Sequence, residues 1–214
     1  MVDLVAGSAD PQAMAVLTQD IAEPGATSAT PARNPAAPAI AGVDRRYLSP
    51  NRDLRGSVCE IHRDSWGLAP RPLQWDFITT RPNALRGVHV HSLRYDYMLV
   101  AHGRATFGLA DLRADSPTFR RSMVFEATGD APCVVIVPPG VAHGIYAHDS
   151  VHYLYGLTAY WDGTDQLGCR FDDPDLGIAW PVRDPILLPR DAALPDFSTF
   201  LRHFEAAGGV RIGD

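Results

Sequence analysis

The 214-residue chain contains no lysine: its 19 basic residues are all arginine, so any permanent positive charge in a site comes from arginine. Cysteine is also scarce. Cys59, Cys133 and Cys169 lie far apart, are odd in number and form no C-x-x-C motif. This usage is typical of reduced thiols in a cytoplasmic protein rather than of a disulfide framework.

Long apolar runs are missing as well. No stretch approaches the roughly 20 residues that cross a bilayer, and no basic segment followed by an apolar one opens the chain. The formal net charge of −6 argues against a surface for nucleic acid or anionic membranes. We therefore expect a soluble, cytoplasmic protein that has neither nucleic acid nor membrane as a partner.

The length and composition predict one folded domain with a tail. Residues 1–42 are rich in Ala, Pro, Ser, Thr and Gly, which cannot bury enough apolar area to offset the entropy of ordering. We expect a disordered, low-complexity tail over residues 1–42, in which residues 13–21 carry the pattern of a short helix. With 46% hydrophobic residues overall, residues 43–214 are long enough for a single buried core.

Short stretches of alternating apolar and polar residues dominate the folded part and are separated by turn-forming Gly, Pro, Asn and Asp. They predict strands at residues 55–61, 73–80, 85–91, 97–102, 105–112, 122–127, 134–138, 144–148 and 151–161. This pattern indicates an all-β fold, an antiparallel barrel or jelly roll. One amphipathic C-terminal helix is predicted at residues 196–207, where apolar side chains recur at helical spacing.

Residues 85–91 carry the strongest prediction of a site. Alternation along a strand places Gly87, His89 and His91 on one face, so both imidazoles point into whatever the strand encloses. Asp96 and His143 follow further along the chain, the latter in a turn-rich stretch. Together they predict a small barrel with a polar pocket inside it.

Seven short motifs occur in register along the chain: Asp-Leu-Arg-Gly at 53–56, Leu-Arg-Gly-Val-His at 85–89, Asp-Leu-Arg at 111–113, Ser-Pro-Thr-Phe at 116–119, Pro-Pro-Gly-Val-Ala-His-Gly at 138–144, Asp-Pro at 173–174 and Ile-Ala-Trp-Pro at 178–181. Together they strongly resemble the dTDP-4-dehydrorhamnose 3,5-epimerase family of cupin-fold enzymes. The resemblance covers about residues 43–197. It implies a cupin barrel, a homodimer, and an isomerase of deoxysugar (rhamnose-type) biosynthesis that needs no cofactor.

The resemblance also implies roles for individual residues. His89 is the base, Asp191 orients and charges it, and Tyr155 is the proton donor. A second set matches the family's substrate contacts: Arg55, Glu60, Gln74, Arg86 and His143. The expected reaction is epimerisation at C3, C5 or both of a nucleotide-activated 4-keto-6-deoxy sugar, through an enolate. Arginine forks suit the diphosphate of such a substrate.

The chain departs from the family pattern next to the predicted base. The family usually has glutamine where this chain has His91, and a lysine near the keto oxygen where it has Asp96. A carboxylate beside a forming enolate opposes the chemistry electrostatically. Arg94, two residues earlier, is a candidate for the missing cation.

These departures support a second interpretation. The four residues His89, His91, Asp96 and His143 match the spacing of metal-binding cupins, and their imidazoles and carboxylate suit Fe, Mn, Ni or Zn. The chain would then be a metal-dependent oxygenase or isomerase. A metal-bound His89 is not a free base, so the two mechanisms exclude each other. A third alternative is a non-catalytic protein that binds sugar nucleotides.

Overall fold

The computed structural model describes residues 30–31, 40–68, 70–165, 167–206 and 208–210. Most of the predicted tail, including the helix suggested for residues 13–21, lies outside the described residues. Ile40 is buried in the central core, and the Ala41 amide donates to Thr118 Oγ1 at 2.9 Å. The division into tail and domain at residue 43 stays a prediction.

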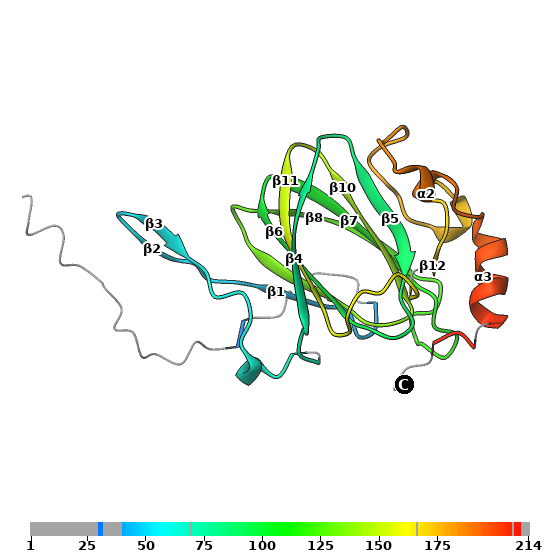
Figure 1. The fold of residues 1–214 in the computed structure, drawn as a ribbon, viewed down its shortest axis with the longest axis horizontal. Helices are drawn as coiled ribbons and strands as arrows, with labels where there is room; N and C mark the ends of the chain where they lie inside the picture. Colours follow the sequence, from blue (N-terminus) through cyan, green and yellow to red (C-terminus); the bar gives the residue numbers. More distant parts are fainter. Residues whose placement is uncertain (1–29, 32–39, 69, 166, 207, 211–214) are drawn as a thin grey trace, which may run out of the picture.

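Two five-stranded antiparallel sheets enclose the interior and form the predicted all-β barrel (Figure 1). The first sheet has the order β1-β9-β6-β11-β4 and the second β12-β5-β10-β7-β8. The strands of the first are β1 Asp44–Tyr47, β4 Gln74–Thr80, β6 Asp96–His102, β9 Cys133–Val137 and β11 Val151–Leu157. Those of the second are β5 Leu85–Val90, β7 Arg104–Asp111, β8 Ser122–Thr128, β10 Val141–Ala147 and β12 Leu167–Gly168.

Inward-facing side chains of both sheets make the central core. Met98 and Val100 of β6 pack there with Phe107 and Leu109 of β7. Because side chains alternate along a strand, Tyr97 and Leu99 of β6 face outward and join a separate apolar cluster. The apolar side chains whose period-two spacing predicted these strands are thus the ones that form the core of the barrel.

The C-terminal part of the chain covers the outer face of the second sheet. Helix α3 (Phe197–Ala206) buries three phenylalanines there and agrees with the helix predicted at residues 196–207. The one-turn helix α2 (Pro189–Ala192) and the 3-10 helix η3 (Pro174–Leu176) lie on the same side (Figure 1). No helix among the described residues is both long and apolar enough to cross a membrane.

The outer face of the first sheet is covered only in part. The 3-10 helix η2 (Asp64–Trp66) buries Trp66 in the cluster outside this sheet. Trp75 and Phe77, on the edge strand β4, stay exposed. An exposed edge strand with large apolar side chains is a surface that proteins usually pair or cover.

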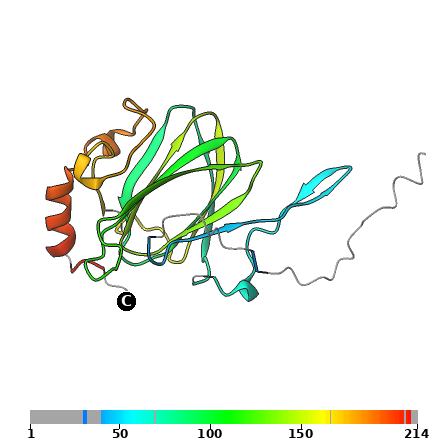
Figure 2. The same cartoon turned by 180° about the vertical axis from the view of Figure 1, so that it is seen from behind.

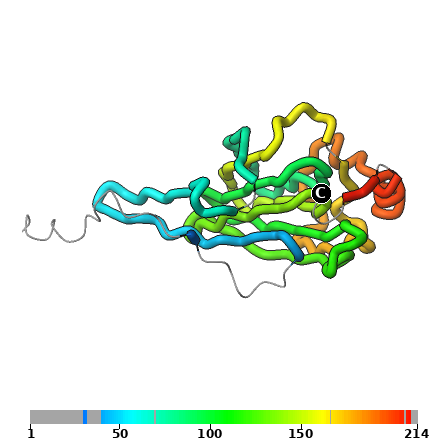
Figure 3. The backbone as a smooth tube through the Cα atoms, turned by 90° about the horizontal axis from the view of Figure 1, so that it is seen from below, coloured from blue at the N-terminus to red at the C-terminus, as the bar shows by residue number. Residues whose placement is uncertain are grey.

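A two-stranded hairpin projects from the barrel at the end opposite α3 (Figures 1 and 2, cyan). It consists of β2 (Asn51–Asp53) and β3 (Gly56–Val58), and the view from below shows it extending beyond the barrel (Figure 3). Leu54 and Val58 are 86% and 71% exposed.

Two predicted strands are shorter in the structure. The strand predicted at residues 55–61 is β3 alone, because the next partner in the hairpin register is Pro50, which has no N–H to donate. The strand predicted at residues 151–161 ends at Leu157, which pairs with the first residues of both neighbours, β4 and β6. Beyond Leu157, Thr158 bonds to Tyr95 through its amide and its hydroxyl, and the regular pairing with both strands ends.

Candidate active site

The predicted catalytic pair is in contact. His89 lies on β5, and Asp191 lies in α2, a single turn with Pro189 at its first position, where the fixed φ of proline suits a helix start. His89 Nε2 is 2.9 Å from Asp191 Oδ1, and the two side chains are 15% and 2% exposed. Because Asp191 in its ionised form only accepts, Nε2 carries the hydrogen and Nδ1 is the basic nitrogen of the ring.

Gly87 breaks the alternation of β5 and sets which side chains accompany His89. The cluster outside the second sheet contains Leu85, Val88 and Val90, at spacings of three and then two residues. The register with β10 shifts by one residue here, and Gly87 has a φ of 123°, which glycine adopts without strain. Arg86 therefore shares the inner side with His89, whereas simple alternation predicts that Gly87 does.

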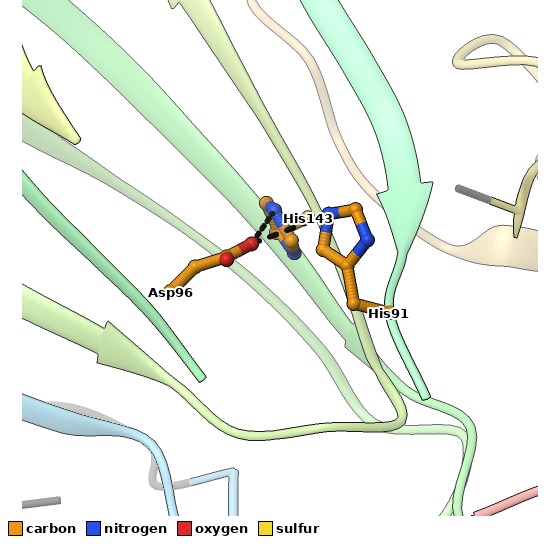
Figure 4. Close-up of side chains that lie close together, drawn as sticks. All are labelled: His91, Asp96 and His143. Carbon is orange, nitrogen blue, oxygen red and sulfur yellow. Dashed lines mark ion pairs between the residues drawn. The ribbon is translucent and has the colours of Figure 1, made fainter. Parts of the chain in front are cut away.

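Asp96 is the centre of a buried polar cluster between the two sheets (Figure 4). Its Oδ2 accepts a hydrogen bond from the Tyr155 hydroxyl at 2.7 Å and lies 3.0 Å from His143 Nε2. Its Oδ1 accepts from Arg94 Nε at 3.1 Å. Asp96 and Tyr155 belong to the first sheet and His143 to the second, so the cluster joins the two walls of the barrel.

The surroundings of Asp96 keep it ionised. Burial alone raises the pKa of a carboxyl, but the hydrogen bond and charge of His143, with the charges of His91 and Arg94, lower the pKa of Asp96 to about 2. Burial and the neighbouring Asp96 raise the pKa of the Tyr155 hydroxyl well above its usual range. Tyr155 therefore keeps its proton at neutral pH, as a proton donor must.

His91 is held as a neutral ring. Its Nδ1 faces the Asp165 carbonyl oxygen at 2.5 Å, so Nδ1 carries the hydrogen, while Nε2 accepts from Arg94 Nη2 at 3.0 Å. Burial lowers the pKa of His91 to about 4, against the opposing pull of Asp96. The dashed contact of 3.3 Å between His91 Nε2 and Asp96 Oδ2 in Figure 4 therefore joins two acceptors at neutral pH and is not an ion pair.

Three of the four predicted metal ligands come together. The nearest ligand atoms of His91, Asp96 and His143 all lie within 4.8 Å of one another. His89 does not belong to this group; its Nε2 is bound to Asp191 instead. The four-ligand cupin site suggested by the spacing is thus not the arrangement of these side chains.

The predicted substrate contacts are scattered. His143 is in the Asp96 cluster, and Gln74 lies on β4, where its amide donates to Asp76 at 3.1 Å. Arg86 donates to Thr80 Oγ1 and the Thr79 carbonyl. Of the remaining two predicted contacts, Arg55 lies on the projecting hairpin and pairs with Asp53, and Glu60 accepts a hydrogen bond from Arg63. All these roles stay predictions.

Asp165 is part of the site, and sequence reasoning missed it. Its carboxylate accepts from the amides of Ser92 and Leu93 at 2.7 and 3.0 Å, and its carbonyl accepts from His91 and, at 3.3 Å, from Arg94. Asp165 lies more than 70 residues from these partners, in the loop after β11. No local pattern marks such a residue, because only the fold brings it to the site.

A double-sheet barrel with polar side chains gathered between its walls is the cupin architecture. Residues 38–199 match the family model of dTDP-4-dehydrorhamnose 3,5-epimerase. The chain belongs to this family, as the motifs predicted.

Individual relatives agree with the family match. The chain is 30% identical over 176 residues to dTDP-4-dehydrorhamnose 3,5-epimerase of Streptomyces griseus, covering 75% of this chain and 86% of the relative. It is 29% identical over 145 residues to the spore coat polysaccharide biosynthesis protein SpsL of Bacillus subtilis, covering 66% and 96%. The crystal structure of dTDP-6-deoxy-D-glucose-3,5-epimerase RmlC from Legionella pneumophila, in complex with dTDP-4-keto-L-rhamnose, superposes with a TM-score of 0.72 at 25% identity, covering 82% and 96%.

Proposed function

We propose that this protein is an isomerase that inverts C3, C5 or both of a nucleotide-activated 4-keto-6-deoxy sugar. The observation that carries the proposal is the bond between His89 and the buried Asp191, in a chain of the epimerase family. A relative of this fold was crystallised with dTDP-4-keto-L-rhamnose, a nucleotide-activated 4-keto-6-deoxy sugar.

In the proposed reaction, Nδ1 of His89 removes a proton from the carbon next to the ketone. The negative charge of Asp191 stabilises the imidazolium that forms and holds the ring in its tautomer. The electron pair moves to the ketone oxygen as an enolate. Tyr155, which is neutral at physiological pH, then returns a proton to the other face of the carbon.

The environment of Asp96 supports this reaction in spite of the carboxylate. Arg94 and His143 contact its two oxygens, so its negative charge is compensated within the cluster. The two ring nitrogens of His143 face the Val141 carbonyl at 3.2 Å and Asp96 at 3.0 Å, so the ring links β10 to Asp96. The cluster therefore places no uncompensated carboxylate charge beside the enolate.

We also propose that the protein is a homodimer. Arg55 matches a substrate contact of the family, but its side chain is 88% exposed on a hairpin that points away from the barrel that holds His89. A second copy that receives this hairpin would gain Arg55 for its own site. The exposed Leu54 and Val58 of the hairpin, and Trp75 and Phe77 on the edge strand β4, supply apolar surface for such an association.

A cytoplasmic location belongs to the same proposal. It is supported by three free cysteines in the part of the chain that the structure describes. The non-catalytic alternative is less well supported, because a protein that only binds sugar nucleotides has no use for a buried carboxylate bonded to the His89 ring.

The proposal predicts exchange with solvent. Incubation of the protein with dTDP-4-keto-6-deoxyglucose in D₂O should yield a sugar nucleotide that carries deuterium at each carbon where the enzyme acts, because the removed proton mixes with solvent before reprotonation. NMR spectroscopy identifies the labelled carbons and the epimer. Absence of exchange with this and other 4-keto sugar nucleotides would contradict the proposal.

A further inference from the structure

The Asp96 cluster has the ligand chemistry of a divalent metal site. Two imidazoles and one carboxylate are a common ligand set for zinc and related ions. Asp96 Oδ2 lies 3.0 Å from His143 Nε2 and 3.3 Å from His91 Nε2. Ligands about 2.1 Å from a tetrahedral ion are separated by roughly 3.4 Å, so these distances are close to those of a formed site.

An arginine already fills the position that such an ion would need. Arg94 Nη2 donates to Nε2 of His91, the lone pair that would coordinate the metal, and Arg94 Nε donates to Oδ1 of Asp96. The opposite nitrogen of His91 is fixed as a donor by the Asp165 carbonyl, so the ring has no second lone pair to offer. The guanidinium therefore bridges the His91 ring and the Asp96 carboxylate, two acceptors that would otherwise repel each other.

The position of Arg94 is fixed by the fold around it. Its side chain is only 5% exposed, and Nη1 donates to the Asp165 carbonyl. The preceding residues, Ser92 and Leu93, are tied to the Asp165 carboxylate through both amides and the Ser92 hydroxyl. The amide of the following Tyr95 donates to a threonine hydroxyl at 2.9 Å. A loop clamped on both sides of Arg94 holds the guanidinium in one place.

We propose that Arg94 is the resident cation of the His91–Asp96–His143 cluster, where it takes the place of a divalent metal ion and holds Asp96 as the acceptor for the Tyr155 hydroxyl. Because Arg94 donates a hydrogen bond to Oδ1 of Asp96, Oδ2 stays directed at the Tyr155 hydroxyl. Arg94 is thus a positioning residue that acts through Asp96. Its effect on catalysis rests on the proposed epimerase function, whereas its effect on metal binding does not.

The test compares Arg94→Met, which removes the charge but keeps much of the length, with Arg94→Lys, which keeps the charge. Arg104→Met is the matched control, since Arg104 pairs with Glu126 on the exposed side of β7. Each protein is titrated with Co²⁺, followed by the visible absorption of the bound ion and by the melting temperature. We expect Arg94→Met to bind one Co²⁺ per chain and to melt at a higher temperature with it. The wild type, Arg94→Lys and Arg104→Met should bind none.

Epimerase kinetics report the positioning role separately. Arg94→Met should lower kcat by at least about tenfold with little change in KM, because only the orientation of reacting groups is lost. An Arg94→Met variant with wild-type kcat would contradict the positioning role. If the wild type shows no epimerase activity, the proposed function fails but the Co²⁺ titration still decides the cation assignment.

Two results would overturn the cation assignment. One is a wild-type protein that binds Co²⁺ in a manner abolished by His91→Ala. The other is a folded Arg94→Met variant that binds no Co²⁺. If Arg94→Met does not fold without metal, the protein is refolded in the presence of Co²⁺ instead of being titrated. We then expect Co²⁺ to restore folded, metal-bound protein in Arg94→Met but not in the double variant Arg94→Met/Asp96→Asn. Failure of Co²⁺ to bind or rescue Arg94→Met would contradict the assignment.

Discussion

Two buried aspartates illustrate how partners decide the role of a side chain. Asp191 Oδ1 contacts the His89 imidazole at 2.9 Å and the Nε of Arg190 at 3.4 Å. The Arg190 side chain is 55% exposed and solvent screens its charge, so the charge of Asp191 stays available to stabilise a proton that His89 takes up. Asp96 contacts Arg94, His143 and the Tyr155 hydroxyl at once, so its charge is already compensated. Asp191 is therefore suited to support His89, the proposed base, and Asp96 is suited to position Tyr155, the proposed proton donor.

A third buried aspartate, Asp111, explains why two of the family motifs recur without touching the site. Its carboxylate accepts hydrogen bonds from Arg113, Ser116 and Thr118, and Arg113 also donates to the Ala41 carbonyl. These bonds connect the end of β7 to the loop that follows it and to the chain before β1. The motifs at residues 111–113 and 116–119 are therefore architectural.

Asp111→Asn should destabilise the fold by about 3–5 kcal/mol at pH 7, because it leaves the buried Arg113 charge without its counter-charge. Burial opposes ionisation of Asp111, but its hydrogen bonds from Arg113, Ser116 and Thr118 lower its pKa below the usual value. The stabilisation is thus fully present above about pH 4 and is lost as the pH falls through the lowered pKa.

Urea unfolding between pH 2 and 7 measures this contribution, and Asp172→Asn, an exposed partner of Arg170, is the control with little expected effect. Wild-type and Asp111→Asn proteins that unfold at the same urea concentration at pH 7 would show that the network does not stabilise the fold.

At the scale of elements, most strands could be predicted because their burial follows their sequence pattern. Strand β1 could not: Asp44–Tyr47 contains three charged residues and no apolar alternation, and it is a strand only because it pairs with β9 along its whole length. The shift at Gly87 is equally invisible to a period-two pattern, since it depends on pairing with β10. Tertiary pairing, not local preference, decides both cases.

The projecting hairpin leads to a test of the proposed dimer. If Arg55 acts in the partner's site, an Arg55→Ala protein and a His89→Ala protein should complement each other. A mixed dimer contains one site with both wild-type residues and one with neither. Equal mixing, followed by unfolding and refolding, should therefore restore up to about a quarter of wild-type activity from two weakly active or inactive proteins.

Activity in the mixture no greater than the mean of the two separate variants would contradict a contribution of Arg55 across the dimer. A mixture of Arg52→Ala, a change on β2 of the same hairpin, with His89→Ala controls for effects of refolding.

At the scale of the whole molecule, one contact between candidate site residues could be predicted and others could not. The family resemblance pointed to His89, Tyr155 and Asp191, and the structure joins the first and last of these directly. The contacts of Tyr155 with Asp96, and of Arg94 with His91, depend on how the two sheets face each other. Regular alternation in the sequence indicates which side chains a strand turns inward, whereas register shifts such as that at Gly87, and the distances across the barrel, follow from the pairing and packing of both sheets.

The most direct measurement of the central claim is deuterium incorporation from D₂O into a 4-keto sugar nucleotide by the wild type, His89→Asn and Tyr155→Phe, followed by mass spectrometry and NMR. The account predicts incorporation and epimerisation by the wild type, and neither by His89→Asn, because the base is gone. Tyr155→Phe should still incorporate deuterium but should form little epimer, because only reprotonation from the other face is lost. Incorporation by His89→Asn at the wild-type rate would contradict the account.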